Sequence, residues 1–366
     1  MLDETAAEFR ASHPDLDQLT TRQKALALNR WLRAENLTGL RSPDRDYRNL
    51  RNCLIGQALR HPEHESIPII SSAIFCCIAY RIGLAAGCCA FPSHVHCVVF
   101  PPRGQTLDGR LDDSPEGLES MYLDPFGNDD EVPEAVLKAF LRRFGWQTSA
   151  ETAMAMMSHA STVSRTAGNI RETYTMFMDG QNRSSSHLTQ LIDGHGPNNM
   201  AACYYASLWV SLMLSPANNL EWDDRFEKFL DRCARTFPED VWLVERYLMP
   251  LYDSMSPLRH RLIRHAGDEP EDAWKVIRLI RRADELPAPV FRRSDTGNSK
   301  VPFKIGDVFR HRRYLWLGVI TGWTDHGSRN VEGSRVVAGN GAREEASDTD
   351  VVNRLRLDNK TYFTYM

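Results

Sequence analysis

The chain has 366 residues, of which 42% are hydrophobic and 25% are charged. These values are ordinary for a soluble globular protein, and the length allows two or three domains. The formal net charge of −4 excludes a general polyanion binder, so any contact with nucleic acid needs a local basic patch. No apolar run is long enough to cross a bilayer, and the acidic N-terminus has no signal-peptide core. We therefore expect no membrane partner and a cytoplasmic and/or nuclear location.

The first part of the chain has the pattern of helices followed by a small sheet. Residues 1–60 carry apolar side chains at helical spacing. Residues 67–84 predict an apolar helix, because Pro68 suits a first turn in which its missing N–H has no partner. Apolar runs that end at strand-breaking prolines or at an aspartate before a proline then predict strands at residues 87–91, 94–100 and 121–123. Helices followed by antiparallel strands predict an α+β core over residues 1–130.

The rest of the chain changes character twice. Residues 131–283 are helical in pattern almost throughout and predict a helical region. Residues 284–300 are rich in breakers and polar side chains, which is typical of a linker. Residues 301–366 contain short β-patterned runs and predict a small SH3-like β-barrel that is incomplete at its C-terminal end.

One histidine and one aspartate are candidates for acid–base chemistry. His94 begins one predicted strand and Asp124 follows the next, so neighbouring strands can bring the two side chains together. A thiol nucleophile beside them would lie in the first turn of the preceding helix, where the helix dipole lowers a thiol pKa. That turn holds no cysteine, and Cys76 and Cys77 lie about two turns further into the helix.

The cysteines predict buried, reduced thiols. The adjacent pairs are poorly placed to bridge each other, and none has the C-x-x-C spacing of a redox or zinc motif. A hydrophobic strand explains the crowded cluster more simply than a metal site does, so we expect no metal and no cofactor there. The cluster consists of Cys88, Cys89, His94, His96 and Cys97.

The runs IPIISSAIFCC, FPSHVHCVVF and YLDPFG resemble the transglutaminase-like core of a group of F-box proteins and their bacterial relatives. In active transglutaminases a cysteine opens the helix, a histidine opens the next strand and an aspartate follows on a third. The resemblance implies that His94 and Asp124 stand at the positions of the base and the orienting carboxylate. The nucleophile position falls near Pro68, so the core resembles a degenerate, non-catalytic version unless Ser71 or Ser72 substitutes.

The run FKIGDVFRHRRYLWLGVITGW resembles the start of the hemimethylated-DNA-binding, or YccV-like, domain. Its basic turn carries four positive side chains against Asp307, a net +3 between residues 301 and 324. Such a patch could neutralise roughly 3 to 4 phosphates. The residues that we expect to contact DNA or a protein partner are Arg310, His311, Arg312, Arg313, Tyr314 and Trp323.

The order of core, helical region and barrel matches those F-box proteins, although the F-box itself is absent from this sequence. The resemblance implies a non-catalytic receptor or scaffold that binds a protein substrate of a ubiquitin ligase, with adaptor docking in doubt. Two alternatives stay open. One is a protein that binds duplex DNA through the YccV-like region, and the other is an active thiol acyl transferase or hydrolase of the transglutaminase type.

Overall fold

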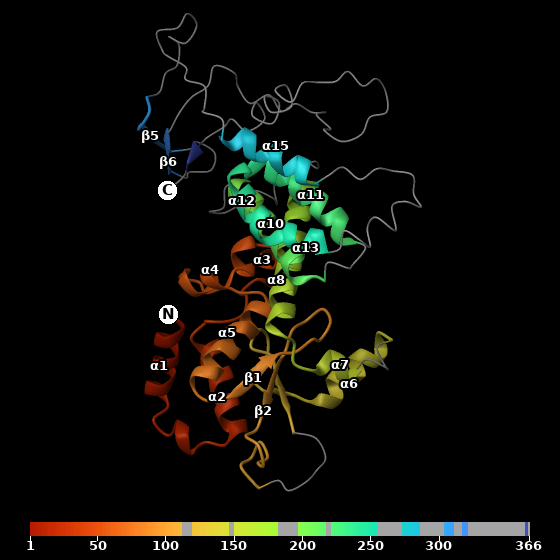
Figure 1. Cartoon of the computed structure of the whole chain (residues 1–366). Coiled ribbons are helices and arrows are strands. Elements are labelled where there is room, and N and C mark those ends of the chain that lie inside the picture. Colours follow the sequence, from red (N-terminus) through yellow and green to blue (C-terminus); the bar gives the residue numbers. More distant parts are fainter. Residues whose placement is uncertain are drawn as a thin grey trace, which may run out of the picture. The chain divides into compact units, whose positions relative to one another are not determined.

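The computed structural model describes residues 1–111, 119–145, 150–181, 197–216, 221–254, 273–285, 304–310, 317–320 and 363–364. The chain divides into two compact units, Met1–Ser207 and Leu208–Met366 (Figure 1). Within the described ranges, no helix combines the length and the apolar character needed to span a membrane. The predicted boundaries after residues 130 and 283 stay predictions.

The first unit begins with helices whose ends follow local sequence signals. Helix α2 (Thr21–Ala34) starts with a capping box, in which Thr20 and Gln23 each bond the other's backbone N–H. Helix α5 (Pro68–Arg81) has its proline in the first turn and is buried over much of its length, as its apolar sequence predicts. The other helical segments before the sheet are α1 (Leu2–Ser12), η1 (Leu16–Gln18), α3 (Pro43–Asp46), η2 (Leu50–Cys53) and α4 (Ile55–Arg60).

A four-stranded antiparallel sheet follows α5. It has the order β1 (Ala85–Cys88), β2 (Cys97–Phe100), β3 (Met121–Leu123) and β4 (Glu131–Val132). The combination of helices with this sheet confirms the α+β class. The predicted strand at residues 94–100 is shorter than expected, because a loop with left-handed backbone at Ser93 precedes it.

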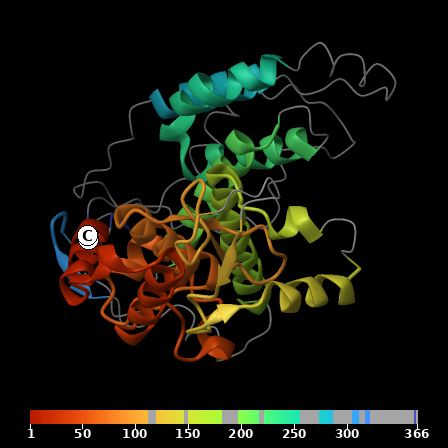
Figure 2. The same ribbon diagram turned by 90° about the horizontal axis from the view of Figure 1, so that it is seen from below.

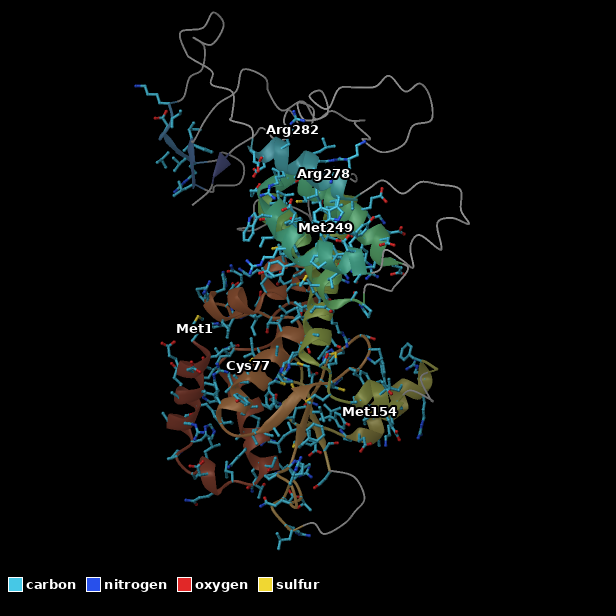
Figure 3. All side chains as sticks on the ribbon, in the orientation of Figure 1. Met1, Cys77, Met154, Met249, Arg278 and Arg282 are labelled. Carbon is cyan, nitrogen blue, oxygen red and sulfur yellow. The ribbon has the colours of Figure 1, made fainter. Side chains whose placement is uncertain are left out.

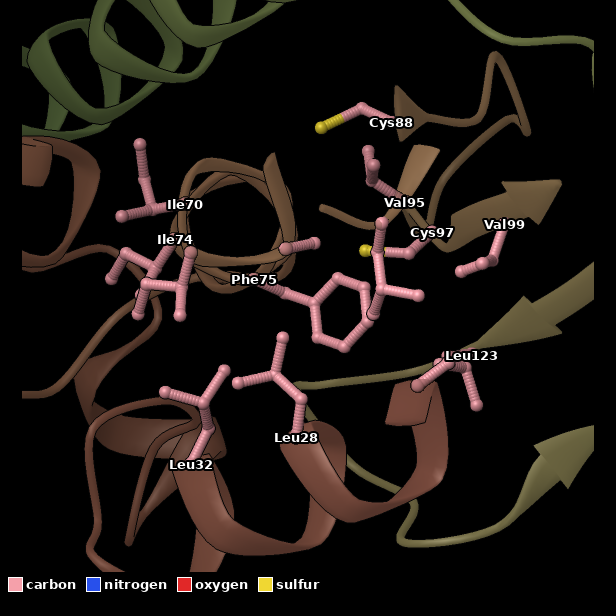
Figure 4. Packing of buried hydrophobic residues seen from close by; sticks show 14 of the residues in the cluster. Leu28, Leu32, Ile70, Ile74, Phe75, Cys88, Val95, Cys97, Val99 and Leu123 are labelled. Carbon is pink, nitrogen blue, oxygen red and sulfur yellow. The ribbon is translucent and has the colours of Figure 1, made fainter. Parts of the chain in front are cut away.

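Helix α5 supplies the centre of the core of the first unit. Phe75 is fully buried and belongs to the same cluster as Leu28 of α2 and Val99 and Leu123 of the sheet (Figure 4). Close packing of this kind fixes α5 against the strands. The start of α5 and the edge of the sheet are therefore held by one rigid core.

The helical region is visible in a second view (Figure 2). Within the described ranges the chain is helical over long segments here, but the segment at 241–252 is interrupted by a π-helical turn, Val244–Leu248. Pro250 lies in the first turn of the helix that follows, so the interruption accommodates a residue without an N–H donor. The elements are α6 (Glu134–Arg143), α7 (Ala150–Met154), α8 (His159–Gln181), α10 (Pro197–Leu214), α11 (Glu221–Thr236), η4 (Pro238–Asp240), α12 (Val241–Leu243), η5 (Val244–Leu248), α13 (Met249–Ser254) and α15 (Ala273–Glu285).

Near the C-terminus, three short strands form an antiparallel sheet in the order β5 (Val308–Arg310), β6 (Leu317–Ile320) and β7 (Phe363–Thr364). Gly306, with a φ of 91°, turns the chain into β5 in a conformation that glycine adopts easily. Most of the predicted linker and most of residues 301–366 lie outside the described residues, so the prediction of an incomplete barrel remains untested.

Candidate functional site

The structure brings His94 and Asp124 together at one edge of the sheet. Nε2 of His94 lies 2.9 Å from Oδ1 of Asp124. Asp124 directly follows β3 and His94 lies just before β2, and these antiparallel strands pair Cys97 with Leu123. Because the end of one antiparallel strand adjoins the start of its partner, the two side chains meet there. Their catalytic role stays a prediction.

The backbone before His94 is held in an uncommon conformation. Ser93 has a φ of 65°, in the left-handed region that costs a non-glycine residue about 1 kcal/mol. The amide of His94 donates to the carbonyl oxygen of Pro92 at 2.8 Å, which closes a tight turn. The fold therefore holds the His94 ring at this edge at a local energetic cost.

A second imidazole, His96, lies beside the pair. Its ring centroid is 4.9 Å from that of His94, and its Nδ1 lies 3.1 Å from the carbonyl oxygen of His94. Burial, with a smaller contribution from the charge of His94, lowers the pKa of His96 to about 4, so that the ring is neutral at neutral pH. The sequence analysis did not assign His96 to this site, although the His-x-His spacing was the available signal.

The environment of Asp124 favours its ionised form. Burial alone would raise the pKa, but the hydrogen bond with His94, together with electrostatic contributions from His94 and, less, His96, outweighs it and lowers the pKa. The amide of Phe126 also donates to Oδ1 at 3.1 Å. An ionised carboxylate beside a histidine is the arrangement that orients and stabilises an imidazolium.

The first turn of α5, where a nucleophile would lie, is closed by serine hydrogen bonds. The Oγ atoms of Ser66 and Ser71 lie 2.7 Å apart, and the amide of Gly39 donates to Oγ of Ser71 at 3.1 Å. Oγ of Ser72 donates to the carbonyl oxygen of Val95 at 3.1 Å. Both Ser71 and Ser72 are fully buried. Neither hydroxyl is hydrogen-bonded to an imidazole that could activate it.

The thiols of α5 lie deeper in the helix and contact other thiols. Cys76 lies 3.8 Å from Cys97. Burial raises the pKa of Cys77 and of Cys97. For Cys76 the contact with Cys88 lowers the pKa, but the contact with Cys97 and burial outweigh it and raise the pKa well above its ordinary range. A raised pKa keeps a thiol protonated and unreactive. Figure 3 marks Cys77 on α5.

All eight cysteines lie in the described part of the chain, and within it none forms a disulfide. Across those residues, no thiol is hydrogen-bonded to His94 or His96. The arrangement therefore offers an imidazole–carboxylate pair that can bind polar groups. It does not have the thiolate–imidazole contact that thiol acyl transfer requires.

A cavity of about 200 Å³ adjoins this site. Phe126 connects the two, because its ring lies 5.6 Å from the His94 ring and it also lines the cavity. The rest of the lining carries charges of both signs and backbone from the turn before α5. The lining residues are Arg33, Asn36, Thr38, Gly39, Leu40, Arg41, Glu63, Glu65 and Phe126.

The second predicted contact surface is described only in part. Arg310 ends β5, pairs in register with Leu317 and is exposed. The remaining predicted contact residues are His311, Arg312, Arg313, Tyr314 and Trp323, and they lie outside the described residues.

Comparison with known protein families finds two matches. Residues 1–168 match the family model of the transglutaminase-like superfamily, and residues 301–350 match that of the hemimethylated DNA-binding protein YccV like. The chain therefore contains a transglutaminase-like domain and a YccV-like domain. No curated protein and no solved structure matched it. These findings do not show the predicted link to F-box proteins or to a ubiquitin ligase, and that link stays a prediction.

Proposed function

We propose that the transglutaminase-like domain is a non-catalytic binding module that recognises a polar segment of a polypeptide. The observation that carries the proposal is the combination of a bonded His94–Asp124 pair with a first turn of α5 that offers buried serines in place of a thiol. An imidazole without a nucleophile can hold a polar group by hydrogen bonds but cannot form an acyl-enzyme.

The neighbouring cavity supports a peptide ligand over a small molecule. Its volume of about 200 Å³ is below the roughly 300–1,000 Å³ of small-molecule sites. It matches one or two side chains of a partner that otherwise lies on the surface. Arg41, Glu63 and Glu65 line it, which favours a ligand that carries polar or charged groups.

The test is a screen of the whole chain against a displayed peptide library, followed by affinity measurement on the selected peptides. We expect Arg41→Glu to weaken binding by at least about tenfold through charge reversal at the cavity. Arg143→Glu, at an exposed arginine in α6, is the matched control and should have little effect. Recovery of a cleaved or covalently attached peptide that depends on His94 would contradict the proposal.

Contact with duplex DNA is a second candidate function, favoured by the match of residues 301–350 to the YccV-like family. Arg310 is exposed at the end of β5, next to the basic turn in the sequence. A patch that neutralises roughly 3 to 4 phosphates gives a slope of log affinity against log salt of about −3. Affinity would then fall about 10- to 100-fold between low and moderate salt.

Fluorescence anisotropy of the whole chain with hemimethylated and unmethylated duplexes tests this candidate. We expect Arg310→Gln to reduce the salt slope by about 1, whereas Arg143→Gln leaves it unchanged. Absence of binding at low salt would remove the candidate. The peptide and DNA measurements are independent, so either can fail alone.

A further inference from the structure

The edge of the sheet gathers three side chains that are common metal ligands. One ring nitrogen from each of His94 and His96 and one carboxylate oxygen of Asp124 all lie within 4.8 Å of one another. Among the described residues, this is the one group of three possible ligands whose ligand atoms lie so close together. It contains none of the cysteines of the cluster that the sequence analysis judged too crowded for a metal site.

The distances suit an ion of the zinc class. Two ligands bound at about 2.0–2.1 Å in tetrahedral geometry lie about 3.3 Å apart. Nε2 of His94 and Oδ1 of Asp124 are already 2.9 Å apart. The largest separation in the set must therefore shrink by at most about 1.5 Å, which a rotation of side chains can provide.

The hydrogen bonds around the set resemble those that orient metal ligands. Because Nδ1 of His96 faces the carbonyl oxygen of His94, Nδ1 is the protonated nitrogen and Nε2 keeps its lone pair. A histidine ligand commonly donates its other N–H to a backbone carbonyl in this way. The amide of Phe126 likewise orients the Asp124 carboxylate.

Access to the set is open on one side. The His94 side chain is 34% exposed and that of Asp124 is 13% exposed, whereas His96 is buried. An ion could enter past His94, displace the proton shared between His94 and Asp124, and keep one coordination position for water. Three protein ligands with one open position are typical of sites at which a metal holds an exchangeable group.

We propose that His94, His96 and Asp124 bind one divalent transition-metal ion, with Zn²⁺ the best match to two imidazoles and a carboxylate. The sequence predicted no metal, because the strand cysteines and the histidines together form a crowded cluster. This inference uses the same His94–Asp124 pair as the proposed binding of a polypeptide, but the two proposals are tested by different measurements.

The experiment is a titration of the whole chain, stripped with a chelator, with Zn²⁺ followed by calorimetry and with Co²⁺ followed by visible absorption. We expect one ion per chain and a Co²⁺ spectrum without intense thiolate charge-transfer bands. His94→Gln and Asp124→Asn should each weaken binding at least about 100-fold, beyond the 10- to 100-fold effect of removing a supporting group. The matched controls are His159→Gln and Asp129→Asn at exposed positions.

A measurement on the unmodified chain covers the case in which the variants do not fold. Nitrogen-15 spectra of the histidine side chains should show the His94 and His96 resonances shifting together on addition of Zn²⁺. Strong thiolate bands, shifts confined to other histidines, or unchanged affinity in folded His94→Gln would each overturn the proposal.

Discussion

Two halves of one site differ sharply in this domain. At the sheet edge, His94 and Asp124 are bonded, partly exposed and preceded by a strained residue. At the start of α5, Ser66 and Ser71 are fully buried and bonded to each other. The first half keeps the features of a reactive site, whereas the second has the features of a core. This difference supports the proposal that the domain binds polar groups without a nucleophile.

The largest expected effect concerns two buried thiols of the core, Cys53 and Cys89. Burial raises the pKa of Cys53 and of Cys89 from 9.0 to about 11. The folded state keeps these thiols protonated, whereas the unfolded state loses their protons above pH 9. Their stabilisation is therefore full below about pH 9 and is lost as the pH rises toward 11, by up to about 2–3 kcal/mol each.

Denaturant midpoints measured across this pH window check the prediction. Cys53→Val should reduce the loss of unfolding free energy between pH 9 and 11 by the amount that Cys53 contributes. Stability that stays constant between pH 9 and 11 would show that the thiols are not core residues.

Ser71→Ala tests the buried start of α5. The substitution leaves the Gly39 amide and the Ser66 hydroxyl without their partner in a buried place, which costs about 1–3 kcal/mol. Ser161→Ala, at an exposed serine of α8, is the matched control and should stay within about 0.5 kcal/mol. Equal unfolding free energies for the two variants would mean that the start of α5 is open to solvent.

How much of this site the sequence could predict depended on the range of the interactions. Pro68 marks the start of α5 locally, and His94 and Asp124 follow from strand order. The network of Ser71 depends on Gly39, which is 32 residues away in the sequence. The role of His96 depends on the turn at Ser93. No local sequence signal predicts the left-handed backbone of Ser93.

Asp124→Asn tests the partly exposed edge of the sheet. It keeps an acceptor for the Phe126 amide but replaces a charge-assisted bond to His94 with a neutral one, so we expect a loss of about 1 kcal/mol at neutral pH. Asp44→Asn, at an exposed aspartate of α3, is the control. A loss above about 3 kcal/mol would mean that this edge is as tightly packed as the core.

The last prediction concerns the strained turn before His94. Ser93 is exposed, so substitutions there act mainly through the backbone. Ser93→Gly relieves the left-handed conformation, whereas Ser93→Val worsens it, and we expect the two variants to differ in unfolding free energy by about 1–2 kcal/mol. Equal stabilities would mean that the turn relaxes without cost.

The most direct test of the central claim is the alkylation rate of each cysteine in the native chain, resolved by mass spectrometry, with and without His94→Gln. We predict that no cysteine reacts faster than a free thiol and that the substitution changes no rate. A cysteine that reacts faster than a free thiol, and slows when His94 is replaced, would contradict this prediction by revealing an activated nucleophile.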